Sequence, residues 1–375
     1  MEYLFEKLAE PGVKLHKGRT DDQKRGKRVF SSFGKIPSRL GELGIVKLDG
    51  KKFEVATENV IKLIPREIQL PKAEENGSRK VKVFVQPDSW IRAKVISDIY
   101  RFSFNSVLLV SGSYTSEGSI FTSFTEESPA EDSQADTILA PLDAKVEEAK
   151  ERIFYAPCSS EKLETNVKNR VQEILEFREE SSQKNFDAEV ECLIRLAILR
   201  VRLSKKVEEK PDLMQLEFLL YQYARARHVL ATMENELETE VDKEKQDLER
   251  KVDWKEIHEF EEELALSIST ADFAVKRFIE ARDICLCSGF VDQIIRFSRS
   301  FSKFYSKCRV LPGCSGFHGD KFELIDDAKE ESLRRLLLVE MFVDRMDTMF
   351  SLLGVSPLHS IKSCSGRWQS QERPA

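Results

Sequence analysis

The sequence of 375 residues lacks the features that mark membrane proteins and secreted proteins. It contains no apolar run approaching the roughly 18 residues of a membrane-spanning helix. Its start, MEYLFEKLAE, carries acids where a signal or transit peptide carries basic residues, which favours a cytoplasmic location. The seven cysteines are scattered and include no CxxC pair. Such usage is typical of reduced thiols rather than disulfides.

Motifs of common enzyme classes are also missing. The chain has five histidines, no P-loop and no HExxH. Cys308, Cys314 and His318 are conceivable metal ligands, but their spacing fits no standard zinc pattern and a fourth ligand is lacking. SGSYTSEG (Ser111–Gly118) faintly resembles a nucleotide or S-adenosylmethionine loop, with less glycine than such loops carry. We therefore expect no catalytic residue, no metal and no cofactor.

Positive charge is scarce overall and concentrated near the start. The net charge of −6 and pI of about 5.7 argue against a general nucleic-acid binder. Residues 1–83 nevertheless carry a net charge of about +7. Salt limits the reach of the negative charges elsewhere in the chain to about 10 Å. A local basic face, or merely a solubilising loop, is therefore expected within Lys14–Arg39. The candidate phosphate contacts there are Lys24, Arg25, Lys27 and Arg28.

Residues 1–118 predict a small basic α/β domain. Val81–Val85 (VKVFV) alternates as a half-buried strand does, and Val107–Val110 (VLLV) is continuously apolar. Between them, Trp90–Phe104 has the apolar spacing of an amphipathic helix. A strand–helix–strand order is typical of α/β layers.

Residues 119–158 predict a flexible acidic linker. FTEESPAEDSQAD (Phe124–Asp136) is acidic and low in apolar residues, so it cannot offset the entropy lost on ordering. A short helix over Asp143–Ile153 is expected to follow. At the other end, residues 362–375 are expected to form a disordered tail.

Residues 159–361 predict an all-α bundle, which makes the fold class α+β overall. Leucines and aromatic residues recur there at three- and four-residue spacing. Pro312 and Gly313 interrupt the pattern, and Gly354 and Pro357 end its last helix.

Three segments of this bundle carry a more specific pattern. LYQYARAR (Leu220–Arg227) follows the form Tyr-Val-Gln-Tyr-Ala-His-Ala-Arg. SFSKFYSKCRVL (Ser300–Leu311) follows Ala-Phe-Ser-x-Phe-Tyr-x-x-Cys-x-Val-Leu. Arg335–Val355 begins Arg-Leu and ends Leu-Leu-Gly-Val. In this order and spacing they resemble the DALR anticodon-binding domain of arginyl-tRNA synthetases. The segment that names that domain is matched loosely at Leu193–Leu196.

The catalytic half of such a synthetase has no counterpart. Leu15–Gly18 lacks the second histidine of a His-Ile-Gly-His turn, and Leu203–Lys206 lacks the methionine of a Lys-Met-Ser-Lys loop. The architecture instead resembles the stand-alone DALR anticodon-binding-domain-containing proteins of eukaryotes. That resemblance implies a non-catalytic adaptor, which binds arginine tRNAs and presents them to a methyltransferase forming 3-methylcytidine in the anticodon loop. Two alternatives remain: a protein-interaction scaffold without tRNA binding, or an accessory subunit of arginyl-tRNA synthetase.

Candidate tRNA contacts follow from how anticodon bases are recognised. Unstacked bases are bound by aromatic or arginine stacking and by hydrogen bonds to their edges. Tyr223 and Arg227 lie one helical turn apart, whereas Arg225 projects differently. Core packing is the alternative role for Tyr223, and a salt bridge within the bundle is the alternative for Arg227. The remaining candidates are Arg299, Lys303, Tyr305, Lys307 and Arg309.

Overall fold

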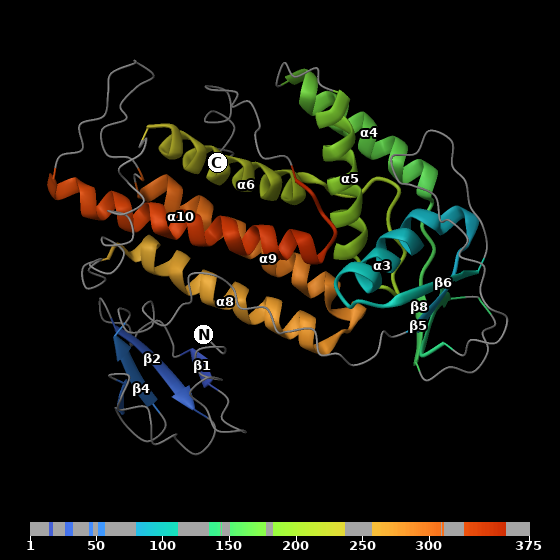
Figure 1. The fold of residues 1–375 in the computed structure, drawn as a ribbon, viewed down its shortest axis with the longest axis horizontal. Coiled ribbons are helices and arrows are strands. Elements are labelled where there is room, and N and C mark those ends of the chain that lie inside the picture. The colour runs from blue at the N-terminus through green and yellow to red at the C-terminus, as the bar shows by residue number, and fades with distance from the viewer. Residues whose placement is uncertain are drawn as a thin grey trace, which may run out of the picture. The chain divides into compact units, whose positions relative to one another are not determined.

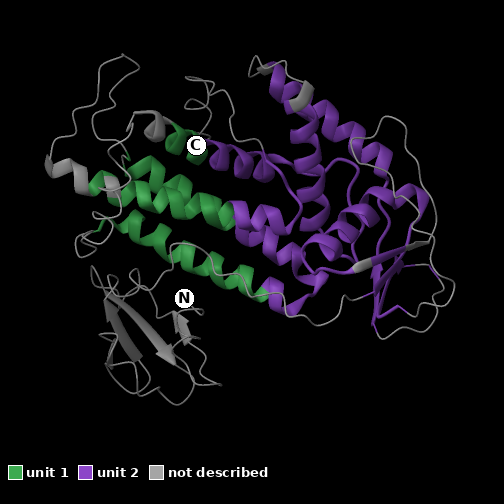
Figure 2. Ribbon diagram, viewed as in Figure 1, with its two compact units in different colours: residues 1–70, 226–277, 296–346 green, residues 71–225, 278–295, 347–375 purple. Residues whose placement is uncertain are grey.

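The computed structural model describes two compact units of the chain (Figures 1 and 2). Unit 1 comprises residues 1–70, 226–277 and 296–346, and unit 2 comprises residues 71–225, 278–295 and 347–375. All the boundaries except the one after residue 70 fall inside helices of the C-terminal half. Side chains are described within residues 80–109, 135–144, 151–176, 185–231, 257–310 and 331–357, with gaps. Among the described helices, none combines the length and apolar character needed to cross a bilayer.

The first sheet is antiparallel, with strand order β1-β2-β4-β3, and only its backbone is described. Two of its strands lie in the basic segment expected to be a loop. Lys27 and Arg28 are the first residues of β2 and pair with Ala56 and Val55 of β4. The strands are β1 (Leu15–Lys17), β2 (Lys27–Ser32), β3 (Ile45–Lys47) and β4 (Lys52–Ala56).

The second sheet is parallel, lies in unit 2 and has strand order β6-β5-β7-β8. Its first part confirms the predicted strand–helix–strand order. β5 (Lys80–Phe84) alternates as expected, with Val81 and Val83 buried. The 3-10 helix η3 (Pro87–Ser89) then leads into α3 (Trp90–Phe102), which buries an apolar face before β6 (Val107–Ser111).

The linker prediction is wrong for two segments within residues 119–158. β7 (Thr137–Pro141) is buried at every position, and it extends the sheet by pairing with β5. β8 (Glu151–Tyr155) replaces the end of the helix expected over Asp143–Ile153. Its alternation explains this, because Ile153 and Tyr155 are buried while Arg152 is exposed. Parallel strands buried on both faces depend on distant partners, which local composition does not reveal.

Helices dominate the rest of the described chain, which confirms the all-α prediction for the C-terminal half. The 3-10 helix η4 (Ile284–Leu286) separates two of them. Residues 362–375 lie outside the described residues. The helices are α4 (Ser160–Phe177), α5 (Gln183–Arg200), α6 (Met214–Glu236), α8 (Glu259–Ala281), α9 (Cys287–Lys307) and α10 (Asp326–Leu352).

A buried ion pair joins α3 to α5 in unit 2. Arg195 donates to Asp98 at 2.8 Å and to Glu191 at 2.9 Å. Gly354, just after α10, has a φ of +62°, and a Cβ there would lie 3.3 Å from Nη1 of Arg195. Glycine suits this position because its missing side chain permits both the left-handed backbone and the close approach.

Unit 1 has an aromatic core and its own buried ion pair. The ring of Phe342 on α10 stacks on Phe301 of α9 at 4.3 Å and lies 4.7 Å from Phe297. Nε of Arg345 donates to Asp272 at 2.9 Å, with these side chains 0% and 3% exposed. A buried guanidinium requires such a partner, because an isolated charge in the interior is very costly.

Candidate nucleic-acid interface

One face of α9 carries a row of exposed cations in unit 1. At 3.6 residues per turn, these side chains fall within an arc of about 80° and span roughly 16 Å along the axis. One of them, Arg296, was not among the sequence candidates, although it precedes Lys303 by seven residues. We call this set the α9 cationic face; it consists of Arg296, Arg299, Lys303 and Lys307.

The apolar side of α9 fixes which way these cations point. Phe297, Phe301 and Phe304 are each no more than 1% exposed. Fully burying one aromatic or aliphatic side chain contributes roughly 1.5–3 kcal/mol. Rotating α9 about its axis would lose that burial, so the cationic face is held toward solvent.

Only one member of the face has an ion pair with a described residue. Nζ of Lys303 lies 2.9 Å from Oε1 of Glu263 on α8. Arg296, Arg299 and Lys307 are exposed and form no ion pair within the part of the chain that the structure describes. These three cations are therefore available to an external anion, while Lys303 is partly neutralised.

Tyr305 does not share this face. Its position is roughly 160° around the helix axis from Lys303 and Lys307. The half-buried ring lies 5.9 Å from Phe301, at the border of the apolar side. The described part of the α9 cationic face is thus suited to phosphates, and an aromatic platform for a base is not part of it.

Tyr223 takes the alternative role of a core residue. Its side chain is 0% exposed, and the ring packs edge-on against Phe350 at 5.3 Å. Its hydroxyl donates to Asp347 at 2.5 Å. A ring enclosed in this way cannot stack on a base without rearrangement.

Arg225 and Arg227, the other two candidate tRNA contacts in the LYQYARAR motif, are half-buried. The guanidinium of Arg225 lies 5.8 Å from the ring centre of Tyr221, a cation–π contact. Arg225 belongs to unit 2 with Tyr223, and Arg227 belongs to unit 1 with the α9 cationic face.

Several sequence candidates lie outside the described structure. Lys24 and Arg25 are among them, and so is Arg309. Lys27 and Arg28 are described only as backbone of β2. Their role as phosphate contacts stays a prediction.

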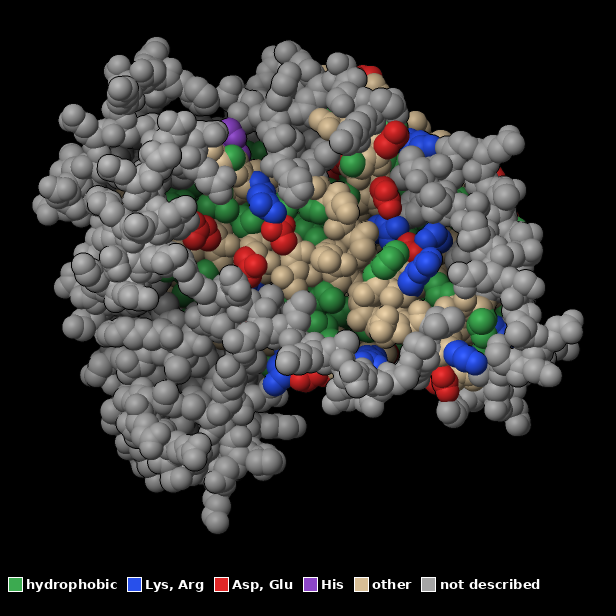
Figure 3. All heavy atoms as spheres, viewed as in Figure 1, with side chains coloured by type: hydrophobic (Ala, Val, Ile, Leu, Met, Phe, Trp, Pro, Cys, Tyr) green, Lys and Arg blue, Asp and Glu red, His purple; other side chains and the backbone are tan. Residues whose placement is uncertain are grey.

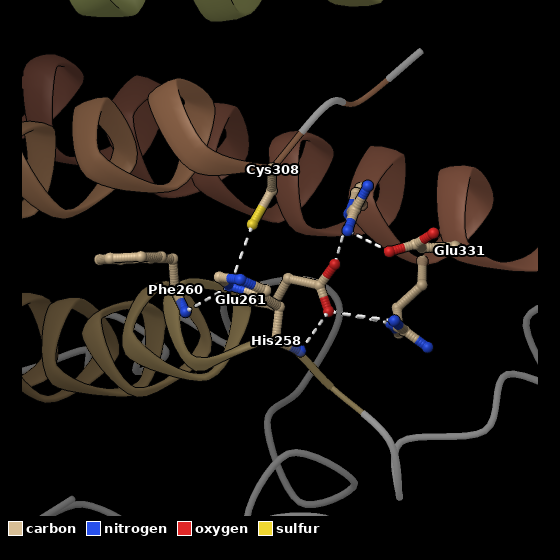
Figure 4. Close-up of polar contacts among 7 residues, drawn as sticks. His258, Phe260, Glu261, Cys308 and Glu331 are labelled. Carbon is tan, nitrogen blue, oxygen red and sulfur yellow. Dashed lines mark hydrogen bonds and ion pairs between the residues drawn. The ribbon is translucent and has the colours of Figure 1, made fainter. Parts of the chain in front are cut away.

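Cys308 faces a different histidine from the one in the conceivable metal trio (Figure 4). Its Sγ lies 3.6 Å from Nδ1 of His258, while Cys314 and His318 lie outside the described residues. Burial, with a smaller effect from Glu261, raises the pKa of the Cys308 thiol to about 11. A thiol protonated at neutral pH is a poor metal ligand. Within the described ranges, no three His, Cys, Asp or Glu side chains gather as a metal site.

Glu261 forms a buried charge cluster beside this pair (Figure 4). Its carboxylate is 0% exposed and accepts from Nε of Arg334 at 3.2 Å, from Nε of Arg335 and from the backbone of His258. Arg335 also bonds Glu331. These two arginines tie α10 to α8 and are committed to that contact, so the cluster stabilises unit 1 rather than adding to its cationic surface. No local sequence pattern predicts this cluster, because Glu261 and Arg334 are 73 residues apart.

Charge is mixed on the one face of the molecule that Figure 3 shows. On the face seen in Figure 3, basic and acidic side chains lie interspersed among apolar and backbone atoms. The α9 cationic face, with its row of cations on one helix, differs from this mixed surface and from the net negative charge of the chain.

Comparison with known protein families agrees with the motifs. Residues 219–361 match the family model of the DALR anticodon binding domain. Among solved structures, the arginyl-tRNA synthetase of Thermus thermophilus matches at 13% identity and a TM-score of 0.42, over 72% of this chain and 49% of its own. A Campylobacter jejuni structure described as an arginyl-tRNA synthetase matches at 12% identity and a TM-score of 0.34, over 86% and 60%. The chain thus spans about half to three fifths of those proteins. No curated protein matches the sequence significantly.

Proposed function

We propose that this chain binds tRNA at its anticodon arm through the bundle at residues 219–361. Two findings support the proposal: the match of those residues to a DALR anticodon binding domain, and the α9 cationic face within them. The α9 cationic face carries the physical argument. Three exposed cations without a described counter-charge, held in a row by a buried aromatic side, suit a polyanion.

The α9 cationic face would supply affinity and orientation. Phosphate contacts position a nucleic acid but do not identify its bases. Base identity must then come from other groups, and Arg225, Arg227, Tyr305 and Arg309 are the candidates. In the described structure, the first three are half-buried, so recognition requires small side-chain movements on binding.

The finer proposal concerns which tRNA is bound and what happens to it. We propose that the chain prefers arginine tRNAs, performs no chemistry itself and hands them to a methyltransferase that forms 3-methylcytidine. This rests on the resemblance of the three motifs to stand-alone DALR proteins and on the missing synthetase signatures. The chemistry would then belong to the partner enzyme, in the cytoplasm.

Equilibrium binding with a matched control tests the tRNA contact. The full chain is titrated against fluorescently labelled arginine tRNA at several salt concentrations, with a non-arginine tRNA in parallel. Each lost phosphate contact lowers the slope of log K against log salt by about 0.7–0.9. We therefore expect Arg299→Ala/Lys307→Ala to bind more weakly and with a slope smaller by about 1.4–1.8.

The control removes the same charge elsewhere. Arg101→Ala/Arg152→Ala changes two exposed arginines of unit 2 that form no ion pair with described residues. It should leave affinity and slope near those of the unchanged protein. Equal losses in both double variants would reduce the effect to overall charge and refute the α9 cationic face.

Reconstitution tests the adaptor role. Purified tRNA 3-methylcytidine methyltransferase and arginine tRNA are incubated with and without the chain, and methyl transfer is measured. We expect modification to depend on the chain and on Arg299 and Lys307. A chain that binds no tRNA would favour the scaffold. Co-purification with arginyl-tRNA synthetase, without an effect on methylation, would favour the accessory subunit.

A further inference from the structure

Arg92 on α3 is buried without a carboxylate among its hydrogen-bond partners. Its side chain is 0% exposed. Nη1 donates to the backbone carbonyls of Ala156 and Lys205, both at 2.7 Å, and Nη2 donates to that of Arg202 at 2.9 Å. Burial lowers its pKa to about 10, so the guanidinium remains charged at neutral pH. Two of the three acceptors lie in the connection between α5 and α6.

The backbone of this connection is therefore held by hydrogen bonds from buried groups. The carbonyl of Leu203 accepts from the backbone of Ala156 at 2.7 Å, just after β8. The amide of Lys205 closes a turn onto the carbonyl of Arg202 at 2.9 Å. Because the carbonyls of residues 202, 203 and 205 are held by these bonds, the backbone of the turn has little freedom.

The side chains of the same turn face solvent. Arg202, Ser204, Lys205 and Lys206 are all exposed. The three cations among them form no ion pair with any residue whose side chain is described. We call Arg202–Lys206 the cationic turn.

The acids that follow in the same connection are mostly engaged elsewhere. Glu209 accepts from Lys162 of α4 at 3.2 Å. Asp212 accepts from the backbone of Met214 at 3.1 Å, at the start of α6. Glu208 is exposed and is the nearest acid in sequence without a described partner. The cationic turn is therefore a local excess of positive charge rather than half of a neutral network.

We propose that the cationic turn is a second contact for tRNA phosphates, held in a binding-ready shape by Arg92. The proposal deepens the tRNA binding proposed above and depends on it. Phosphate binding needs only positioned positive charge, which the turn supplies without further ordering of its backbone. The hydroxyl of Ser204 adds a donor of the kind that contacts phosphate oxygens. A protein partner is less well matched, because the centre of a protein interface is apolar or aromatic and the turn exposes neither.

The test compares two triple variants of the full chain in tRNA titrations across salt. Arg202→Ala/Lys205→Ala/Lys206→Ala removes the turn's charges without touching a buried group. Lys80→Ala/Arg101→Ala/Arg152→Ala removes equal charge from other exposed positions of unit 2 that form no ion pair with described residues. We expect the first to weaken binding about tenfold and to lower the salt slope by about 2–3, at 0.7–0.9 per contact. The second should change both little.

The outcomes separate this proposal from the one before it. If the unchanged chain binds tRNA and the two triple variants behave alike, the cationic turn is not a contact, while the α9 cationic face stands or falls on its own variants. If the unchanged chain does not bind tRNA, both proposals are overturned. If the turn variant binds tRNA normally but loses a co-purifying acidic protein, the turn serves a protein instead, and this proposal is wrong.

Arg92 gives a second measurement, because it acts through the backbone. Arg92→Met leaves all three surface cations in place but releases the carbonyls that hold them. We expect weaker tRNA binding with a salt slope close to that of the unchanged chain, because the number of cations is unchanged. A slope that falls as far as in the triple variant, or an unchanged affinity in a folded variant, would contradict the positioning role.

Discussion

Glu263 gives a sharp test of the α9 cationic face, because its removal should improve binding. In the free protein this carboxylate lies 2.9 Å from Nζ of Lys303. A phosphate that recruits Lys303 must displace Glu263 or bind beside its negative charge. Glu263→Gln removes that competitor while keeping nearly the same size and shape.

The structure sets the size of the expected gain. The two side chains are 58% and 37% exposed, so their pair is worth only about 0.2–1 kcal/mol. If binding must give up this interaction, Glu263→Gln should strengthen tRNA affinity about 1.4- to 5-fold, because 1.4 kcal/mol corresponds to tenfold. The gain should shrink as salt is raised, since exposed pairs are screened.

Two controls make the result specific. Glu173→Gln removes an acid from another surface pair, where the carboxylate lies 3.2 Å from Arg170 and its side chain is 68% exposed, and should leave affinity unchanged. In a Lys303→Ala background, Glu263→Gln should lose most of its effect, because residues in contact are not additive. Anisotropy titrations of the unchanged chain, the three single variants and the Lys303→Ala/Glu263→Gln double variant measure this. A gain equal to that of Glu173→Gln, or one that persists without Lys303, would refute the assignment of Lys303 to phosphate.

Two further predictions concern the core. Tyr223→Phe removes a hydrogen bond to Asp347 and should lower the free energy of unfolding by about 1.5–3 kcal/mol in urea titrations, with tRNA affinity unchanged; a large loss of affinity in the folded variant would show that Tyr223 touches RNA. Arg345→Met strips Asp272 of its counter-charge and should cost about 3–5 kcal/mol. Burial already raises the pKa of Asp272, and the variant raises it further. A carboxyl group whose pKa is raised in the folded protein stabilises the fold at low pH, and this stabilisation is lost as the pH rises. The loss of unfolding free energy in the variant should therefore be larger at pH 8 than at pH 5. The reverse trend would contradict the buried pair.

Local patterns in the sequence predicted most of the helical architecture. Phe297, Phe301 and Phe304 recur at helical spacing, and all three are buried as that spacing indicates. The same spacing places Arg299 and Lys303 on the opposite side, where the structure has them. These features depend only on the period of one helix, so the sequence alone determines them.

Features that depend on distant partners were not predictable. β7 and β8 were expected to be linker and helix, because their identity as strands depends on pairing: β7 pairs with β5, where Thr137 lies opposite the distant Val81, and β8 pairs with β7 in turn. The ion pair of Asp98 and Arg195 bridges 97 residues. The cationic turn belongs to this class too, since its rigidity depends on Arg92, 110 residues from Arg202. A pattern within one element carries no information about such contacts.

Photo-crosslinking tests the central claim most directly. A photoreactive amino acid is placed at Ser306, which is exposed on α9 between Lys303 and Lys307, and the complex with arginine tRNA is irradiated. Sequencing the crosslinked RNA should locate the adducts in the anticodon stem and loop, whereas the same probe at exposed Thr165 of α4 should not. Crosslinks scattered over the tRNA, or equally strong at both positions, would contradict an anticodon-arm interface on α9.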